Sequence, residues 1–345
     1  MCALWCASAW TLRPAKERAS GNFNAMSAAD PSATNRFVLT GPTGWIGRAM
    51  LAKMHALGDP DALGADDRLA LFGSRQGTIV APDGPELEIR SLANIGPADV
   101  AGAHVIHLAY LTKDKMEQHG VDQFHRINTA IDDALLDAIA ADRPASLFVA
   151  SSGAAQLAED GRDAHPYGLA KLEQEGRFLA WAEKSGVPTL CGRIFNLAGP
   201  HINKLESYAV SNFALQAMRG GPIRIEAKQP VFRSFLHVDD LCGIILRAAR
   251  LRIRRDRPID LCGTEVLEMQ DIAEMVSAAV GGDIPIERPA LTSASKSVYL
   301  GSGQDTRELA LELGLNLARA DVQVRDSVSW MHELNAISMN CKVRL

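Results

Sequence analysis

The sequence predicts an α/β fold in which a doubly wound parallel sheet of Rossmann type is joined to a smaller C-terminal lobe. Three observations lead to this prediction. A glycine-rich turn near residue 40 connects an apolar run to a helical pattern. Apolar runs of strand length then alternate with helical patterns, as in sheets that have helices on both faces. The chain of 345 residues is also too long for most single compact cores.

Strands and helices alternate along the first part of the chain. An apolar run at 37–39 predicts the first strand, and apolar residues at helical spacing predict a helix after it. Further buried strands are expected at 68–72, 86–90, 104–108, 146–150 and 188–195, with helices at 121–140 and 167–184. Because the apolar runs are continuous rather than alternating, we expect a parallel sheet that is covered on both faces.

From residue 197 the alternation weakens. The expected elements there are helices at 206–219, 238–250, 269–280, 305–313 and 321–334, and short strands at 223–226 and 232–236. We therefore expect one domain over 36–196, with 232–262 partly returning to it, and a smaller lobe built from 197–231 and 263–335. Residues 1–35 show no periodicity and are expected to form a flexible extension.

Composition and charge exclude several classes of protein. The net charge of -5 and the pI near 6.0 argue against broad binding to nucleic acid or to an anionic membrane. No apolar stretch is long enough to span a bilayer. The six cysteines lack zinc-finger spacing, so no metal is expected. Cys191, Cys242 and Cys262 stand in apolar surroundings and are expected to be small buried residues, which suggests a reducing compartment, the cytoplasm. Five arginines between 250 and 257 are expected to be a solvated helix end rather than an anion site.

The turn after the first strand has the spacing of a nucleotide-binding loop. Gly41, Gly44 and Gly47 stand three residues apart, directly between the strand and the helix. The first glycine permits the tight turn, the second lets phosphates approach the backbone, and the third lets helix pack on strand. The free N–H groups of the helix N-terminus can then bind a pyrophosphate. An isolated glycine triplet would be a weak signal, but here strand and helix flank it as the motif requires.

A second group of residues predicts acid–base chemistry. Tyr167 and Lys171 are four apart on an expected helix and therefore share a face. A nearby ammonium stabilises a phenolate and so lowers the pKa of the tyrosine. The fifth strand ends in Ser151 and Ser152, and a serine there can orient the reacting oxygen. A tyrosine and a lysine at this spacing also occur by chance on exposed helices, so the preceding loop and serines give the pair its weight.

These residues make the chain similar to a known family, the extended short-chain dehydrogenase/reductases, specifically the NAD(P)-dependent nucleotide-sugar epimerase/dehydratase group. The resemblance covers roughly residues 36–332. It rests on motifs that follow one another in the family's order: Gly41-Pro-Thr-Gly44-Trp-Ile-Gly47, His107-Leu-Ala109, Asn128, Tyr167 with Lys171, Arg193-Ile-Phe-Asn196-Leu-Ala-Gly199-Pro200, and Arg233-Ser-Phe-Leu-His237-Val-Asp-Asp240.

The resemblance implies a role for each matching position. Tyr167 would be the general acid and base, and Lys171 would bind the nicotinamide ribose and tune Tyr167. Asn196 would lie at the sugar nucleotide and Arg233 at its diphosphate, so the smaller lobe would bind substrate. The resemblance places the cofactor at Gly41, Thr43, Gly44, Trp45, Ile46, Gly47, Leu108, Ala109 and Asn128. Relatives form homodimers through the helices that match 121–140 and 167–184, and a homodimer is therefore expected.

The chain departs from the family pattern after the fifth strand. Many members have a third small hydroxyl residue where this chain has Gly153, and that residue is usually catalytic. Ser152 or Ser151 is therefore expected to serve instead. The 4,6-dehydratases of the family have an Asp-Glu pair there, whereas this chain has Gly153 and Ala154. Dehydration of the sugar is therefore not expected.

The end of the second strand bears on the choice between NAD and NADP. An NAD enzyme usually has a carboxylate there for the ribose hydroxyls, whereas an arginine accommodates a 2′-phosphate. No acid is present at 73–75, so Ser74 and Arg75 slightly favour NADP. The alternative is that Arg75 stacks on the adenine or faces solvent.

The function that the sequence predicts is hydride transfer at a carbon of a nucleotide-linked sugar, with Tyr167 and Lys171 as the acid–base pair. An epimerase and an NADPH-dependent reductase would use the same residues, so both stay open. Two other classes of protein are less favoured. A non-catalytic dinucleotide sensor would be expected to lack the tyrosine or the lysine. An enzyme acting on a steroid-like or small carbonyl compound would not need the motifs of Asn196 and Arg233.

Overall fold

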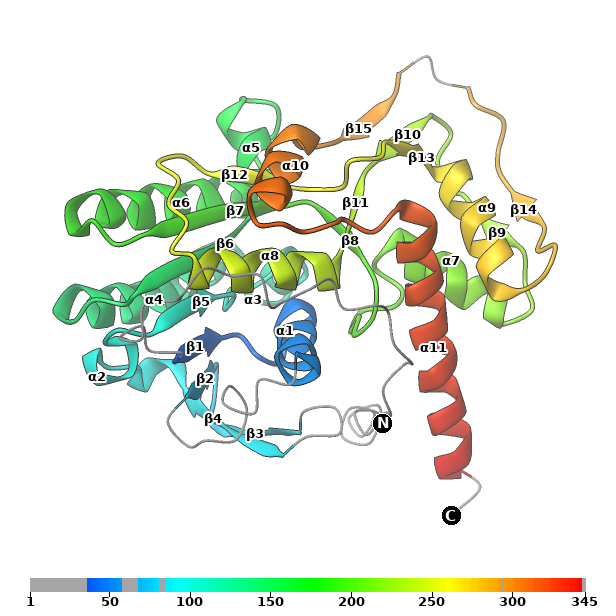
Figure 1. The fold of residues 1–345 in the computed structure, drawn as a ribbon. Coiled ribbons are helices and arrows are strands. Elements are labelled where there is room, and N and C mark those ends of the chain that lie inside the picture. Colours follow the sequence, from blue (N-terminus) through cyan, green and yellow to red (C-terminus); the bar gives the residue numbers. More distant parts are fainter. Residues whose placement is uncertain (1–35, 58–67, 81–84, 293–294, 343–345) are drawn as a thin grey trace.

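The computed structural model describes residues 36–57, 68–80, 85–292 and 295–342. Within these residues eight strands form the central sheet, in the spatial order β12-β7-β6-β5-β1-β2-β4-β3 (Figure 1). Neighbouring strands are parallel except for β3 and β4. This confirms the predicted Rossmann-type sheet. The strands are β1 (Phe37–Thr40), β2 (Leu69–Gly73), β3 (Gly77–Val80), β4 (Glu86–Ser91), β5 (His104–His107), β6 (Ser146–Ser152), β7 (Thr189–Ile194) and β12 (Ile259–Leu261).

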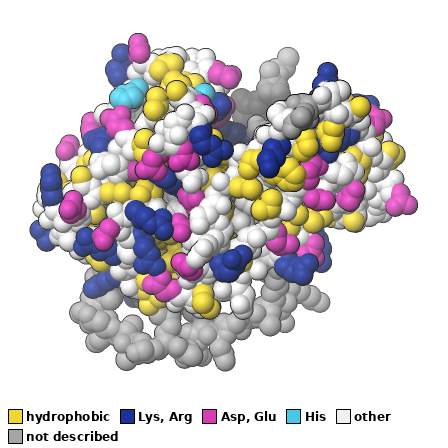
Figure 2. Space-filling view, turned by 90° about the horizontal axis from the view of Figure 1, so that it is seen from above, with side chains coloured by type: hydrophobic (Ala, Val, Ile, Leu, Met, Phe, Trp, Pro, Cys, Tyr) yellow, Lys and Arg dark blue, Asp and Glu magenta, His cyan; other side chains and the backbone are white. Residues whose placement is uncertain are grey.

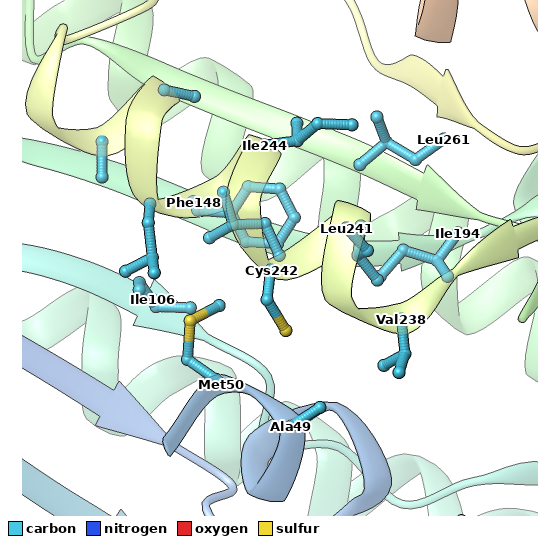
Figure 3. Close-up of a cluster of buried hydrophobic side chains, with 14 of the residues drawn as sticks. Ala49, Met50, Ile106, Phe148, Ile194, Val238, Leu241, Cys242, Ile244 and Leu261 are labelled. Atoms are coloured by element: carbon cyan, nitrogen blue, oxygen red, sulfur yellow. The ribbon is translucent and has the colours of Figure 1, made fainter. Parts of the chain in front are cut away.

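Helices cover both faces of the sheet because successive strand residues point to opposite sides. On one face Phe37 and Leu39 belong to a core cluster with α1 (Trp45–Ala56) and α8 (Val238–Arg250). Figure 3 shows Met50 of α1 and Cys242 of α8 meeting there beneath Phe148 of β6. On the other face Val38 packs with residues of α4 (Val121–Ala141) and α6 (Pro166–Ser185).

A second core cluster lies beyond the sheet, among α7 (Ala209–Met218), α9 (Met269–Val280) and the first half of α11 (Ala320–Lys342). These helices stand together at one side of the molecule (Figure 1). Short strands accompany them: β10 (Val231–Arg233) pairs with β13 (Leu267–Glu268) and β15 (Ser297–Tyr299), and β9 (Ile223–Arg224) pairs with β14 (Ile286–Glu287). A further pair, β8 (Asn196–Ala198) and β11 (Phe235–His237), connects this region to the sheet. The domain limits given above stay a prediction.

The structure contains elements that the sequence patterns did not predict. The edge strands β3 and β12 are short, and β3 is mostly exposed, so neither produces a long apolar run. The helices α3 (Lys113–His119) and α5 (Gly153–Glu159), the latter directly after β6, were also missed. Three further short elements lie beside the sheet. They are η1 (Leu92–Asn94), α2 (Pro97–Val100) and α10 (Gly303–Glu312), which packs against β12. The predicted flexible extension at 1–35 lies outside the described residues.

The arginines between 250 and 257 form ion pairs rather than an open cationic patch. Arg257 binds Asp305 at 3.0 Å, and Arg255 pairs with Glu312, so two of them tie this segment to α10. Basic and acidic side chains are interspersed on the face shown in Figure 2. The predicted burial of Cys191, Cys242 and Cys262 is confirmed, and all three are free thiols. Among the described helices none combines the length and apolar character needed to cross a bilayer.

Candidate active site

The glycine turn has the geometry that binding of a pyrophosphate requires. Gly41 has a φ of 73°, which favours glycine, and a Cβ on Gly47 would lie 2.3 Å from the carbonyl oxygen of Gly41. Helix α1 begins directly after Gly44 with neither a side-chain cap nor an acidic residue in its first turn. Its first N–H groups are thus available to an anion. A dinucleotide therefore fits this turn, whose other residues include the exposed Thr43 and the partly buried Ile46.

Trp45 extends from this turn toward the second lobe. Its indole N–H donates to the carbonyl oxygen of Pro200 at 2.7 Å, and its ring lies against Tyr208 at 5.0 Å. The side chain of Trp45 is therefore buried in the junction between the turn and the segment that follows β8.

The segment after β5 lies directly against the glycine turn. A Cβ on Gly41 would be 2.9 Å from the backbone nitrogen of Ala109, so the two segments approach closely. The Thr40 hydroxyl accepts hydrogen bonds from the backbone N–H groups of Leu108 (3.1 Å) and Ala109 (3.0 Å). Asn128 of α4 is buried, and its Oδ1 accepts from Leu111 N at 2.7 Å, whereas its Nδ2 finds no acceptor among the described residues. Asn128 thus holds the segment after β5 in place through Leu111, and its Nδ2 group is left to donate to a ligand.

Replacing Gly47 with alanine is expected to weaken binding of NADH by at least about tenfold, because the new methyl group would overlap the Gly41 carbonyl oxygen at 2.3 Å. Titration of the protein with NADH, followed by fluorescence, measures this. Gly77→Ala is the matched control, since its Cβ would meet no atom within 4 Å. Equal affinities in the wild type and Gly47→Ala would exclude this turn as the site of the pyrophosphate.

Ser152 and Tyr167 are brought together at the carboxyl end of β6. Ser152 is the N-cap of α5, where its Oγ accepts from Ala154 N at 3.2 Å. Burial raises the pKa of Tyr167 to about 12, and the Ser152 hydroxyl acts on this pKa in the opposite direction. A hydroxyl next to a buried phenol is the arrangement that proton transfer to a bound alcohol or carbonyl needs.

Ser151 points to the other side of the strand. Its hydroxyl donates to Glu175 Oε1 at 2.5 Å, and Glu175 is held in turn by Arg193 through two hydrogen bonds of 2.8 and 2.7 Å. Successive residues of a strand face opposite ways, so Ser152 does not face this group. The structure places Ser151 in a buried ionic group and Ser152 at the start of α5.

The departure at Gly153 has a steric cause. A Cβ on Gly153 would lie 2.4 Å from Phe195 and 2.6 Å from the phenol oxygen of Tyr299. The volume that a third hydroxyl residue would fill is thus taken by two aromatic side chains, which pack on each other with centroids 5.0 Å apart. This explains why the chain has glycine at 153.

Lys171 lies on the same helix as Tyr167, but no hydrogen bond joins their side chains in the described structure. Its ammonium donates to the carbonyl oxygen of Ala150 (2.7 Å) and to Gln174 Oε1 (2.8 Å), and it lies 3.5 Å from the ring centroid of Tyr110. Burial lowers the pKa of Lys171 to about 8. The ammonium of Lys171 thus contacts Ala150, Gln174 and Tyr110 rather than Tyr167.

A buried hydrogen-bonded chain holds Lys171 in this position. Gln174 Nε2 donates to Asp132 Oδ1 (2.7 Å), which also faces His107 Nε2 (3.2 Å), and His107 Nδ1 lies 2.9 Å from the Thr40 hydroxyl. Because Thr40 already accepts two backbone N–H groups, its own proton points to Nδ1, and Nε2–H of His107 donates to Asp132. These hydrogen bonds thus connect Lys171 to Thr40 and, through it, to the segment after β5.

Ser74 and Arg75 follow β2, at the same edge of the sheet as the glycine turn, and both are exposed. Within the described parts of the chain Arg75 has no acidic partner. The preceding Gly73 is needed for packing, because a Cβ there would lie 2.9 Å from Ile89. The two side chains are therefore available to a ligand but held by no protein contact.

Arg233 lies on β10, with its guanidinium carbon 6.0 Å from the ring centroid of Tyr299. Its guanidinium donates to the carbonyl oxygens of Phe232 (2.8 Å) and Ser297 (3.3 Å) and to Ser297 Oγ (3.2 Å), and it has no carboxylate partner among the described residues. Burial lowers the pKa of Arg233. A partly buried arginine without a counter-ion is suited to bind an anion. Asn196 is the first residue of β8, which pairs with β11. Its Nδ2 donates to the carbonyl oxygen of Ser234, the residue after Arg233, at 3.2 Å.

Sequence reasoning missed several residues of this site. Tyr299, on β15, has its phenol oxygen 2.6 Å from the position of a Cβ on Gly153, and Phe195 packs on it. Tyr110 contacts Lys171, and its ring lies 6.3 Å from that of Tyr167. In the sequence, Tyr110 follows the expected strand at 104–108 and Phe195 ends the one at 188–195, signals too weak to single them out, and no local pattern marks Tyr299.

Comparison with known proteins gives the site its context. The model of the NAD dependent epimerase/dehydratase family matches residues 37–260. UDP-glucuronic acid decarboxylase 6 of Arabidopsis thaliana is 27% identical over 129 residues, which cover 36% of this chain and 37% of the relative. The alignment thus spans little more than a third of that relative's length.

Solved structures of similar fold cover most of the chain. A dTDP-glucose 4,6-dehydratase from Streptomyces venezuelae with NAD bound gives a TM-score of 0.65 at 18% identity, over 86% of this chain and 97% of the other. A UDP-N-acetylglucosamine 4-epimerase from Bacillus cereus gives 0.65 at 18% identity, over 86% and 96%. At this identity the likeness concerns the fold, whereas the family model spans well over half of the chain. The chain belongs to the NAD-dependent epimerase/dehydratase family.

Proposed function

We propose that this chain oxidises and reduces a carbon of a nucleotide-linked sugar, with Tyr167 as the acid and base. The observation that supports this most is the position of Ser152 near Tyr167 at the same sheet edge as the glycine turn. The relatives compared above act, by their names, on UDP- or dTDP-linked sugars. They catalyse decarboxylation, dehydration and epimerisation, so the family alone does not select the reaction.

Each residue of the site then has a chemical task. Tyr167 exchanges the proton of the hydroxyl group that becomes a carbonyl, while Ser152 donates a hydrogen bond to the reacting oxygen or to the phenolate. Lys171 stabilises the phenolate by its charge and, in this proposal, binds the nicotinamide ribose. When bound on residues 41–47, the cofactor supplies the acceptor and donor of the hydride at that carbon. Its oxidised ring is positive and would lower the pKa of Tyr167 from the value in the free protein.

Arg233 is proposed to bind the substrate diphosphate, because a partly buried guanidinium held by carbonyl oxygens lacks a counter-charge. Arg233→Leu is expected to raise KM for a UDP-sugar by about 30-fold or more, because the diphosphate would lose a charged hydrogen-bonding partner. The change in kcat should be smaller. Steady-state kinetics measure this. Arg224→Leu is the control, since Arg224 pairs with Glu287 on the exposed surface. An unchanged KM would exclude a diphosphate at Arg233.

Epimerase and reductase are the two forms of the proposal. An epimerase retains its cofactor through the cycle, whereas a reductase exchanges it at each turnover. The exposed Ser74 and Arg75, with no acid at 73–75, favour NADP and so an NADPH-dependent reductase of a keto-sugar. Mass spectrometry of any dinucleotide released from the purified protein decides between them. Near-stoichiometric NAD(H) would support the epimerase, and an empty site that prefers NADPH to NADH would support the reductase.

A homodimer through α4 and α6 is also proposed. The outer face of α6 exposes Leu169, Gly176 and Ala180, and a Cβ on Gly176 would meet no atom within 4 Å. Gly176→Arg is therefore tolerated by one protomer and would obstruct the close approach of a second. Light scattering is expected to give a dimer mass for the wild type and a monomer mass for Gly176→Arg. Leu311→Arg, at an 80% exposed position of α10, is the control and should stay dimeric. A monomeric wild type at micromolar concentration would contradict the proposal.

A further inference from the structure

Lys171 is a buried cation whose side chain contacts no carboxylate among the described residues. It is 3% exposed, and its ammonium donates to the carbonyl oxygen of Ala150 and to Gln174 Oε1. The ring centroid of Tyr110 lies 3.5 Å from the same nitrogen. An ammonium in such a place has lost its hydration and needs a negative charge nearby to stay protonated.

The amide of Gln174 joins Lys171 to the carboxylate of Asp132 on α4. Gln174 Oε1 accepts from Lys171 Nζ at 2.8 Å, and Gln174 Nε2 donates to Asp132 Oδ1 at 2.7 Å. Because an ammonium can only donate and a carboxylate can only accept, one orientation of the amide satisfies both partners. Gln174 and Asp132 are 1% and 3% exposed, so both hydrogen bonds are shielded from water.

His107, the other partner of Asp132, is neutral. The Thr40 hydroxyl accepts from two backbone N–H groups of the segment after β5, which occupies both of its lone pairs. Thr40 therefore donates its proton to His107 Nδ1 at 2.9 Å, and a ring nitrogen that accepts carries no proton. His107 thus meets Asp132 as a neutral donor, through Nε2–H at 3.2 Å. In the described parts of the chain no lysine or arginine forms an ion pair with Asp132, so Lys171 balances its charge across the amide.

The other titratable groups around Lys171 supply no such charge. Glu175, one turn further along α6, is joined to Arg193 of β7 by two hydrogen bonds, so a cation already balances it. Burial raises the pKa of three further groups and keeps them uncharged near neutral pH: Cys191 of β7, Tyr110 and Tyr167. Asp132 is therefore the carboxylate in this surrounding whose charge is left for Lys171.

We propose that Asp132 is a positioning residue for Lys171: it is the counter-ion that keeps the ammonium charged and in place through the amide of Gln174. This inference rests on the proposed function, in which Lys171 binds the nicotinamide ribose and opposes the charge of a phenolate. Asp132→Asn retains an oxygen that accepts from Gln174 and His107, so it removes the charge and keeps the hydrogen bonds.

The test measures the ionisation of Lys171 directly, by NMR of protein labelled with 13C at lysine Cε. Lys171→Arg identifies the resonance. Burial lowers the pKa of Lys171 to about 8, so ammonium and amine are comparable at that pH in the wild type. Asp132→Asn is expected to lower the ammonium-to-amine ratio at about pH 8 by about tenfold, which corresponds to one pKa unit, because a neighbouring negative charge is lost.

Asp133→Asn is the matched control. It removes the next carboxylate of α4, which is 51% exposed and pairs with Arg177. Because water screens this charge, the ratio should change by less than about twofold. Equal ratios in Asp132→Asn and Asp133→Asn would overturn the inference.

Exchanging the two buried side chains separates charge from packing. In Asp132→Asn/Gln174→Glu the carboxylate stands next to Lys171 and the amide next to His107, and every donor still meets an acceptor. This double variant is expected to return the ratio at least to its wild-type value, and failure to do so would contradict the role of the charge. Since it retains the net charge of the buried group, it tests the inference even where Asp132→Asn alone is unfolded.

Binding of NADH, followed by fluorescence, separates this inference from the proposed function. Asp132→Asn is expected to weaken binding about fivefold at about pH 8, because a neutral amine is a poorer donor to the ribose, and to bind like the wild type at about pH 6. If the ratio changes and the affinity at pH 8 does not, the proposed contact of Lys171 with the ribose fails and the inference stands. If the ratio is unchanged, the inference fails and the proposed function is untouched.

Discussion

Tyr167→Phe is expected to lower kcat by about three orders of magnitude, because it removes the group that exchanges a proton with the reacting oxygen. The ring would still pack against Tyr110 and Phe124, whose centroids lie 6.3 and 6.4 Å away, so the fold should be unaffected. Incubation of NAD-loaded protein with UDP-glucose, UDP-galactose and UDP-glucuronic acid, followed by NMR of the sugar anomeric protons, finds the converted sugar and measures its rate.

The pH dependence of the wild type gives an independent check on this role. A base whose pKa lies above neutrality makes kcat/KM for alcohol oxidation rise with pH until the phenol has ionised. Since burial places the pKa of Tyr167 at about 12 before any cofactor charge acts on it, the rise should extend well above pH 7. Tyr208→Phe, which removes a phenol outside the hydrogen bonds of Ser152, should keep this profile. A Tyr167→Phe protein with wild-type kcat would remove Tyr167 from the mechanism.

Arg193→Met is expected to destabilise the protein by about 3–5 kcal/mol, because it leaves the Glu175 carboxylate buried without its cation. The side chains of Arg193 and Glu175 are 7% and 2% exposed, and two hydrogen bonds of 2.8 and 2.7 Å join them. Although burial acts to lower the pKa of Arg193, the hydrogen bonds of Glu175 and Glu159 raise it. Urea denaturation followed by circular dichroism measures the free energy of unfolding.

Two further variants make this second prediction specific. Arg224→Met removes a pair that is 59% and 56% exposed and is screened by water, so little or no loss of stability is expected. Adding Glu175→Gln to Arg193→Met should recover part of the loss, since the amide oxygen still accepts from Ser151 and no charge stays buried. If Arg193→Met costs no more than Arg224→Met, the buried group is not what holds β6, β7 and α6 together.

Most of the central fold could be predicted from local patterns. The strands near 37, 69, 104, 146 and 189 were found because strands buried on both faces read as continuous apolar runs. The glycine turn could be predicted for a similar reason, since Gly41 and Gly47 are required by backbone contacts within the turn and with the segment after β5. The short edge strand β3 was missed because an exposed strand needs no apolar run.

In the candidate site, too, local patterns predict some residues but not their contacts with distant segments. Tyr167 and Lys171 could be paired from their spacing on one helix, but the contacts of Lys171 could not, because Ala150, Gln174 and Tyr110 reach it from three segments. The sequence left Ser151 and Ser152 as alternatives. Strand alternation separates them, and only the tertiary contacts show that Ser151 binds Glu175 whereas Ser152 caps α5.

The sequence by itself determined the sheet, the glycine turn and the tyrosine–lysine spacing, because steric limits on the backbone and the periodicity of burial act between residues close in the chain. The tertiary structure alone decided what fills the space above Gly153. Phe195 and Tyr299 meet Gly153 only after the second lobe has packed on the sheet, and contacts between residues so distant in sequence leave no local pattern.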